Sequence, residues 1–175
     1  MKAIQVLDAL EQYAPLPLQD GFDNAGLQIG LTAEQEVTGA LLCLDVTEAI
    51  VDEAERCVIK AIQRGIAIYA AHTNLDNAQG GVNYRIADKI GLKNLSFLEA
   101  KTTAVPAGAG VIGELSIAED EREFLLRLKS LFGIQCIRHN ALCGRKVRRV
   151  ALCGGAGGFL LPNAIAQGAD AFLTG

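Results

Sequence analysis

The sequence predicts an α/β protein, and three features lead to this fold class. Apolar runs typical of buried strands, such as Ile66 to Ala71 and Val150 to Cys153, alternate with segments whose apolar residues recur at helical spacing. Half of the 175 residues are hydrophobic but only 5% are aromatic, so the core must consist of Ala, Val, Ile and Leu, the usual filling of α/β layers. Gly65 and Gly91 follow two of the predicted helices as C-terminal stops.

The N-terminal part is predicted to begin with a helix and a short strand. The helix ends at Pro15-Leu-Pro17, because proline cannot continue it, and its apolar positions are Ile4, Leu7 and Leu10. A turn-rich segment follows and merges into a strand at residues 27–29. Its Asp23 and Asn24 are expected to bond their own backbone in an Asx-turn.

A strand–helix–strand unit is predicted next. Val37 to Leu44 is an apolar strand, and Thr47 begins a helix whose apolar face continues without a break to Gly65. The strand at 66–71 completes a βαβ unit, which is expected to be right-handed. Asn83 to Ile90 adds a further helix.

The segment from Lys101 to Gly113 is rich in turn residues, which predicts a boundary between an N-terminal α/β half, residues 1–100, and a C-terminal half, residues 101–175. Within it, Gly108 to Gly113 matches the G-x-G-x-x-G dinucleotide fingerprint as a bare string. We reject that match because Pro106 precedes it and strand-like residues follow it, whereas the fingerprint lies between a strand and a helix. The remaining predicted elements are a helix from Glu119 and strands at 150–153 and 169–174.

Composition and charge argue against several classes of protein. No apolar run approaches the ~20 residues of a membrane span, and the N-terminus lacks a secretory hydrophobic region, so we expect a cytoplasmic protein that does not bind membranes. A net charge of -4 argues against nucleic-acid binding, and the basic residues within 138–149 are interpreted as solvated strand flanks. The cysteines are odd in number and form no C-x-x-C pair, so we expect small buried side chains rather than disulfides or a thiolate zinc site: Cys43, Cys57, Cys136, Cys143 and Cys153.

One loop brings together residue types that carry chemistry. The strand at 66–71 ends in a polar segment that contains His72 and Asp76, and ligands collect where the strands of α/β sheets end. Gly80-Gly81 then permits a sharp turn into the next helix. The alternative is that His72 and Asp76 bond the loop backbone and cap the helix at Asn83.

A second loop, Gly154 to Gly158, follows a strand and precedes a helix with Pro162 in its first turn. Bare N–H groups in such a loop can hold an anion. The loop lacks the Lys and Ser/Thr of a P-loop, so tight packing against the sheet is an equal alternative.

Four groups of residues occur in a characteristic order along the chain. They are Asp23-Asn-Ala-Gly-Leu-Gln-Ile-Gly30, then Ala71-His-Thr-Asn-Leu-Asp76 with Gly80-Gly81-Val-Asn83, then Gly110-Val-Ile-Gly-Glu-Leu115, and Ala151-Leu-Cys-Gly-Gly-Ala-Gly-Gly158 with Ala169-Asp-Ala-Phe-Leu-Thr-Gly175. Together they resemble the NGG-interacting-factor-three-like dinuclear metal centre family, whose members are often named GTP cyclohydrolase 1 type 2 homologues. The resemblance covers nearly the whole chain.

The resemblance implies two related α/β halves with mixed sheets flanked by helices, assembled into a homohexamer around an internal cavity. It also implies two divalent metal ions, drawn from Zn, Fe, Mn, Ni and Mg, with Asp76 as a ligand and His72 as a weak ligand or supporting group. The expected function is a metal-dependent hydrolase of a nucleotide-like or phosphorylated small molecule. The alternatives are a non-catalytic ring-forming assembly or metal-responsive binding protein, and an anion-binding module that uses Gly154 to Gly158.

The chain departs from the family at the metal site. The strand with an adjacent histidine pair is missing after the helix that begins at Thr47, because two helices are fused near Arg56-Cys57. The histidine and glutamate expected beyond the final Thr-Gly are missing as well, so the C-terminal half is expected to be truncated. Either the sequence omits segments of a longer chain, or it is a deletion form that would bind such metals weakly or not at all.

Overall fold

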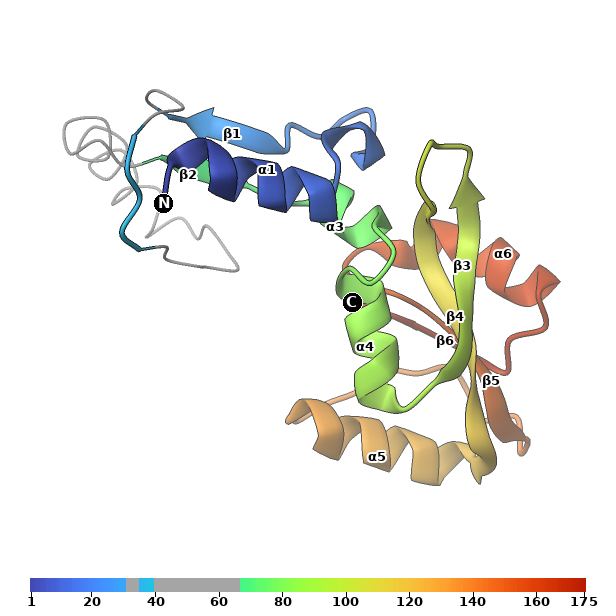
Figure 1. The fold of residues 1–175 in the computed structure, drawn as a ribbon. Coiled ribbons are helices and arrows are strands. Elements are labelled where there is room, and N and C mark those ends of the chain that lie inside the picture. The colour runs from blue at the N-terminus through green and yellow to red at the C-terminus, as the bar shows by residue number, and fades with distance from the viewer. Residues whose placement is uncertain (31–34, 40–66) are drawn as a thin grey trace. The chain divides into compact units, whose positions relative to one another are not determined.

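The chain divides into two compact units. The computed structural model describes residues 1–30, 35–39 and 67–175. The first unit is Met1–Leu75 and the second is Asp76–Gly175. Helices alternate with strands as predicted, so the α/β fold class is confirmed (Figure 1).

The first unit combines one helix with a two-stranded antiparallel sheet. Its elements are helix α1 (Ala3–Tyr13), the 3-10 turn η1 (Leu16–Leu18) and strands β1 (Gly26–Ile29) and β2 (Ile68–Ala70). Gly26 lies opposite Ala70, so the residues before β1 and those after β2 meet at the same end of the sheet. Most of the predicted strand at 37–44 lies outside the described residues. The predicted helix from Thr47 lies outside them entirely.

The second unit is built on a four-stranded mixed sheet. Its strands are β3 (Lys93–Lys101), β4 (Ala107–Asp120), β5 (Lys146–Cys153) and β6 (Ala171–Thr174), and they follow the order β3-β4-β5-β6. The first three strands pair antiparallel, whereas β5 and β6 are parallel. A parallel neighbour requires a crossover, and the turn η2 (Gly157–Leu160) with helix α6 (Leu161–Ala166) provides it.

Helices cover both faces of this sheet. Helices α4 (Val82–Ile90) and α5 (Glu121–Phe132) pack on one face, and η2 with α6 packs on the other (Figure 1). Successive side chains of β5 point to opposite faces of the sheet. Val150 and Leu152 pack in the core beneath α4 and α5, whereas Ala151 packs in the core beneath η2 and α6. The short helix α3 (Thr73–Asn77) spans the division between the two units.

Local signals explain where the helices of the second unit begin and end. The Asp120 carboxylate caps α5 by accepting a hydrogen bond from the backbone N–H of Arg122 at 2.9 Å. Glycines in the left-handed conformation end both long helices, Gly91 after α4 with φ 89° and Gly133 after α5 with φ 65°.

The turn-rich segment 101–113 contains the hairpin turn at residues 102–106 and the first half of β4. Strands β3 and β4 pair on either side of this turn, so the expected division between residues 100 and 101 falls inside the second unit. Strand β3 escaped prediction because Asn94 adopts a left-handed conformation (φ 53°) and a register irregularity interrupts its alternation. The rejected dinucleotide string lies wholly within β4, where a Cβ at Gly108 would come within 2.5 Å of the Glu99 carbonyl oxygen.

The expectation that the cysteines are buried is wrong for Cys136 and Cys143, whereas Cys153 is partly buried and packs against the second core cluster. Cys136 and Cys143 are exposed and Cys153 is partly exposed, all as free thiols. Residues 134–145 contain no helix or strand, and the first two cysteines lie on this exposed segment. Cys43 and Cys57 lie outside the described residues.

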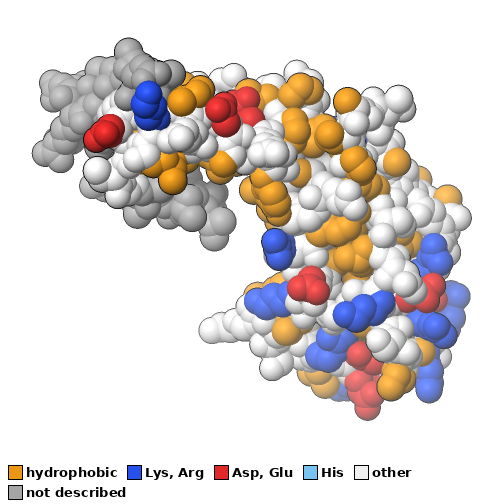
Figure 2. Space-filling view, in the orientation of Figure 1, with side chains coloured by type: hydrophobic (Ala, Val, Ile, Leu, Met, Phe, Trp, Pro, Cys, Tyr) orange, Lys and Arg blue, Asp and Glu red, His pale blue; other side chains and the backbone are white. Residues whose placement is uncertain are grey.

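Charges of both signs are interspersed on the surface of the second unit. Figure 2 shows Lys and Arg side chains alternating with Asp and Glu around α5 and the adjoining strand ends. Arg148 and Arg149 of the basic cluster both approach the Glu114 carboxylate, at 3.6 and 3.5 Å. In the described ranges, no helix is both long enough and apolar enough to span a bilayer.

We predict that Phe124→Ala destabilises the protein strongly. The side chain is 1% exposed and packs in the core between α5 and the sheet, so truncation should cost about 3–5 kcal/mol of unfolding free energy. Urea denaturation would measure the change. The control is Leu126→Ala on the same helix, which is 60% exposed and should cost no more than about 0.5 kcal/mol. Equal losses in the two variants would contradict the described packing of α5.

Candidate functional site

The candidate site lies at one end of the small sheet in the first unit. His72 and Thr73 follow β2, and Asp23 precedes β1. Gly26 pairs with Ala70 in the antiparallel sheet. The segment before Gly26 and the segment after Ala70 therefore leave the sheet side by side, which places Asp23 near residues 72 and 73. Two segments that are far apart in the sequence therefore meet at this edge.

The Asp23 carboxylate is the centre of the site. Its Oδ1 lies 3.0 Å from Nδ1 of His72 and accepts the backbone N–H of Asn24 at 2.7 Å. Its Oδ2 accepts two hydrogen bonds from Thr73, one from the backbone N–H at 2.9 Å and one from the hydroxyl at 2.5 Å. The Thr73 hydroxyl in turn accepts the backbone N–H of Asp20 at 2.8 Å. Both carboxylate oxygens are thus held by donors of fixed position.

The electrostatics of this cluster favour an ionised Asp23. Burial opposes its charged form, but hydrogen bonds from Thr73 and His72 outweigh burial and hold the pKa of the Asp23 carboxyl well below its ordinary value. The Asp23 side chain is 9% exposed, whereas that of His72 is 63% exposed. A buried, ionised carboxylate therefore lies behind an imidazole that faces solvent.

Sequence reasoning identified His72 but missed its partner. The Asp23 carboxylate bonds the N–H of the next residue, Asn24, and not that of the residue two positions on, as the expected Asx-turn would require. The same carboxylate also binds residues 49 and 50 positions further along. The signal available in the sequence was the position of Asp23 just before a strand that pairs with the strand preceding His72. That signal becomes visible only when the pairing of β1 with β2 is known.

Asp76, the predicted metal ligand, lies in α3 at the start of the second unit. Its carbonyl oxygen accepts a hydrogen bond from the side-chain amide of Asn83 at 3.1 Å. Helix α4 begins at Val82, one residue before the expected start at Asn83, and its cap residue Gly81 makes no side-chain cap bond. Asn83 joins the Asp76 carbonyl to the N–H of Gly154, which its Oδ1 accepts at 2.8 Å.

The glycine-rich loop 154–158 is held by bonds within the protein. Besides the Gly154 bond to Asn83, the N–H of Gly157 binds the Thr174 hydroxyl at 2.9 Å. A Cβ at Gly157 would collide with the Cys153 side chain. Two of its N–H groups are therefore occupied, which favours tight packing over anion binding at this loop.

The described residues do not assemble a complete two-metal site. In residues 1–30, 35–39 and 67–175, no three His, Cys, Asp or Glu side chains are grouped so that they could hold an ion. The sequence has two histidines, His72 and His139. His139 lies on the irregular segment 134–145, where its Nδ1 lies 2.7 Å from the Asn140 carbonyl oxygen. A dinuclear centre needs a bridging carboxylate and several more ligands, so this donor set does not fit one.

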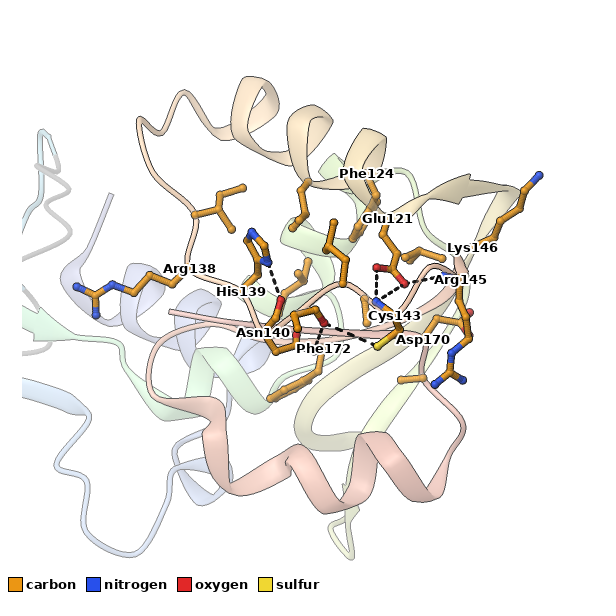
Figure 3. A pocket seen from close by; sticks show the side chains of 18 residues that line it. Glu121, Phe124, Arg138, His139, Asn140, Cys143, Arg145, Lys146, Asp170 and Phe172 are labelled. Atoms are coloured by element: carbon orange, nitrogen blue, oxygen red, sulfur yellow. Dashed lines mark hydrogen bonds between the residues drawn. The ribbon is translucent and has the colours of Figure 1, made fainter.

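A cavity of about 240 Å³ lies beneath the irregular segment in the second unit (Figure 3). The Glu121 carboxylate at its edge accepts the N–H groups of Cys143 and Arg145, each at 2.8 Å, and so anchors the segment. The long side chains of Arg138 and Lys146 point away from the cavity in Figure 3. The bonds that His139, Cys143 and Glu121 make at this cavity go to backbone groups and not to one another, so the Asp23–His72 cluster is the better candidate.

The sequence profile of the family described as Duf34/NIF3 (NGG1p interacting factor 3) matches residues 1–57 and 54–175. A Clostridium perfringens protein named GTP cyclohydrolase 1 type 2 homolog is 28% identical over 203 positions, covering 100% of this chain and 77% of that protein. A Schizosaccharomyces pombe protein named Protein NIF3 homolog is 30% identical over 196 positions, covering 90% of this chain and 69% of that protein.

Solved structures show the same fold. The crystal structure of Staphylococcus aureus protein SA1388 matches with a TM-score of 0.85 at 26% identity, over 100% of this chain and 79% of that one. A Bacillus cereus protein related to NIF3 matches with a TM-score of 0.84 at 21% identity, over 100% of this chain and 82% of that one, which is a likeness of fold alone.

We predict that Asp23→Asn lowers the melting temperature at neutral pH and that its effect fades in acid. The lowered pKa of Asp23 means that its carboxylate stabilises the folded state above the ordinary carboxyl pKa of about 3.9, and that this contribution is lost as the pH falls through the lowered value. Thermal melts of both proteins from about pH 7 down to about pH 2 would measure the gap, which should be constant at first and narrow below about pH 4.

The control for this experiment is Asp8→Asn, which changes an exposed carboxylate on α1. It should leave the melting temperature nearly unchanged at every pH. A gap between wild type and Asp23→Asn that stays constant or grows on acidification would contradict the assigned role of the Asp23 charge.

Proposed function

This chain belongs to the Duf34/NIF3 family, and from that membership we propose that it is a hydrolase of a nucleotide-like or otherwise phosphorylated small molecule. The names of several relatives, GTP cyclohydrolase 1 type 2 homolog, support the nucleotide class. In the complete family form, two divalent ions would polarise the substrate and supply hydroxide. The described donors do not complete that site, and the proton transfer that they can support involves protein side chains only.

The contact between His72 and Asp23 is the observation that carries this proposal. An exposed imidazole held 3.0 Å from a buried carboxylate is an arrangement that accepts a proton from an attacking water. Asp23 remains ionised throughout and stabilises the imidazolium that forms. The water oxygen bonds to the electrophilic atom of the substrate while one water proton passes to His72. The bond from that atom to the leaving group then breaks, and His72 returns the proton to the leaving group.

The incomplete donor set favours a second candidate, a non-catalytic ring-forming assembly or metal-responsive binding protein. In that case the protein would act through the homohexamer that the family resemblance implies. Asp76 and His72 would then bind a metal that controls assembly and would not take part in catalysis. The two candidates differ in what they require of the side chains. A hydrolase needs the basicity of His72, whereas an assembly needs only the surfaces between subunits.

We predict that His72→Ala lowers kcat for hydrolysis of GTP by about 10²–10⁴-fold, the usual contribution of a general base. Turnover of GTP by purified protein, followed by chromatography of the products, would measure the loss. His139→Ala is the matched control, because it removes the chain's other imidazole from a segment far along the sequence and should leave the rate unchanged. Full activity in His72→Ala would rule out the proposed role, and activity that survives Asp76→Ala would count against a metal-dependent reaction.

We also predict that the 175-residue chain, with its intact mass verified, holds well under two transition-metal ions. The two histidines of the chain and the described carboxylates provide too few ligands for a dinuclear centre. Elemental mass spectrometry of purified protein would count the ions. About two ions per chain would contradict the prediction and imply further ligands, and loss of a hexamer on chelation would favour the metal-responsive assembly over the hydrolase.

A further inference from the structure

We propose that Asp23 is a positioning residue that holds the neutral His72 ring as the tautomer with its proton on Nδ1. The lone pair of the ring then lies on Nε2, so Nε2 is the atom that accepts a proton from water or binds an electrophile. The inference deepens the proposed function and rests on it for its chemical meaning, but the tautomer can be measured without any activity.

Hydrogen-bond roles in the cluster determine which partner carries the proton. The two Asp23 oxygens meet only donors elsewhere, namely the N–H of Asn24 and the N–H and hydroxyl of Thr73. A carboxylate so surrounded is ionised and can only accept. The contact of 3.0 Å between Oδ1 and Nδ1 therefore requires the proton to be on Nδ1 of His72.

Both partners of this contact are held in place. On one side, Thr73 binds Asp23 through two groups and is itself tied to Asp20. On the other side, the N–H of His72 donates to Oδ1 of Asn74 at 2.9 Å, and the side-chain amide of Asn74 donates to the Ala14 carbonyl at 2.8 Å. Asn74 is 0% exposed, so the backbone that carries the exposed ring is anchored in the core.

This arrangement reverses the preference that a histidine ring has in water, where the proton resides mainly on Nε2. Without Asp23, the lone pair would lie mainly on Nδ1, on the side that faces the protein. With Asp23, the lone pair lies on Nε2, the nitrogen farther from the backbone. The segment around Asp23 thereby acquires a chemical role that its turn-forming residues did not suggest.

The replacement Asp23→Asn should reverse the tautomer rather than merely weaken the contact. Thr73 is buried and donates two hydrogen bonds to the Oδ2 position, so the oxygen of the new amide should face Thr73. Its NH₂ group then faces Nδ1 of His72 and can only donate. The ring must accept on Nδ1 and carry its proton on Nε2.

The tautomer can be measured by ¹⁵N NMR of protein labelled at histidine, at about pH 9, where histidine rings are ordinarily neutral. The full chain contains two histidines, so two rings contribute to the spectrum. We expect His72 to show a protonated Nδ1 and an unprotonated Nε2. His139 is an internal standard, since its Nδ1 meets a carbonyl, which cannot donate, at 2.7 Å.

Three variants complete the test. Asp23→Asn and Asp23→Ala should both move the His72 proton to Nε2 and leave the His139 signals in place. Asn24→Ala keeps the backbone N–H that binds Asp23 and should retain the wild-type tautomer. A wild-type His72 protonated on Nε2, or an unchanged tautomer in both Asp23 variants, would overturn the inference.

The wild-type spectrum tests the inference even if a variant does not fold, which the dispersion of its backbone amide spectrum would reveal. The proposal about the tautomer and the proposal about hydrolysis can also be refuted independently of each other. The expected tautomer in a protein that hydrolyses no nucleotide would end the proposed function and leave the role of Asp23 intact, whereas hydrolysis with the proton on Nε2 would do the reverse.

Discussion

The candidate site depends on one carboxylate that would be costly to bury without partners. The Asp23 side chain is largely withdrawn from solvent, and a charge in that position persists only if donors surround it. Those donors are the backbone N–H groups of Asn24 and Thr73 and the Thr73 hydroxyl. The Asp23 carboxylate can therefore stay ionised only when the segment around Asp23 and the segment around Thr73 have folded together. The orientation of His72 follows from the same set of bonds. Structure and chemistry in the first unit thus have a common origin.

Much of the fold follows from local patterns in the sequence. Helices α1, α4 and α5 and strands β1, β2, β5 and β6 were predicted because apolar periodicity, prolines and glycines mark them clearly. Strand β3 was not, since its bulge and the left-handed Asn94 disturb the alternation that a prediction relies on. The hairpin turn after it contains the same residue types as a linker, which is why it was interpreted as a boundary.

The site was predicted less completely than the fold, for a physical reason. His72 stands out because it follows a strand, but the partner of an imidazole is determined by tertiary contact. Asp23 has a sufficient local explanation as an Asx residue, and only the register of β1 against β2 places it beside His72. The exposed cysteines show the same limit, because burial depends on whether layers cover a segment and not on the residue type.

The bonds between Asp23 and Thr73 close a loop of fifty residues, and the length of that loop has little influence on the closure. The entropic cost of joining the ends of a chain rises only logarithmically, by about 0.6 kcal/mol for each doubling in length. The family profile matches in two pieces that meet at residues 54–57, within this loop, and the Clostridium perfringens alignment needs 203 positions for a chain of 175. An insertion or deletion between Asp23 and Thr73 would therefore change the cost of closing this loop by only a fraction of a kcal/mol, unless it doubled or halved the loop length.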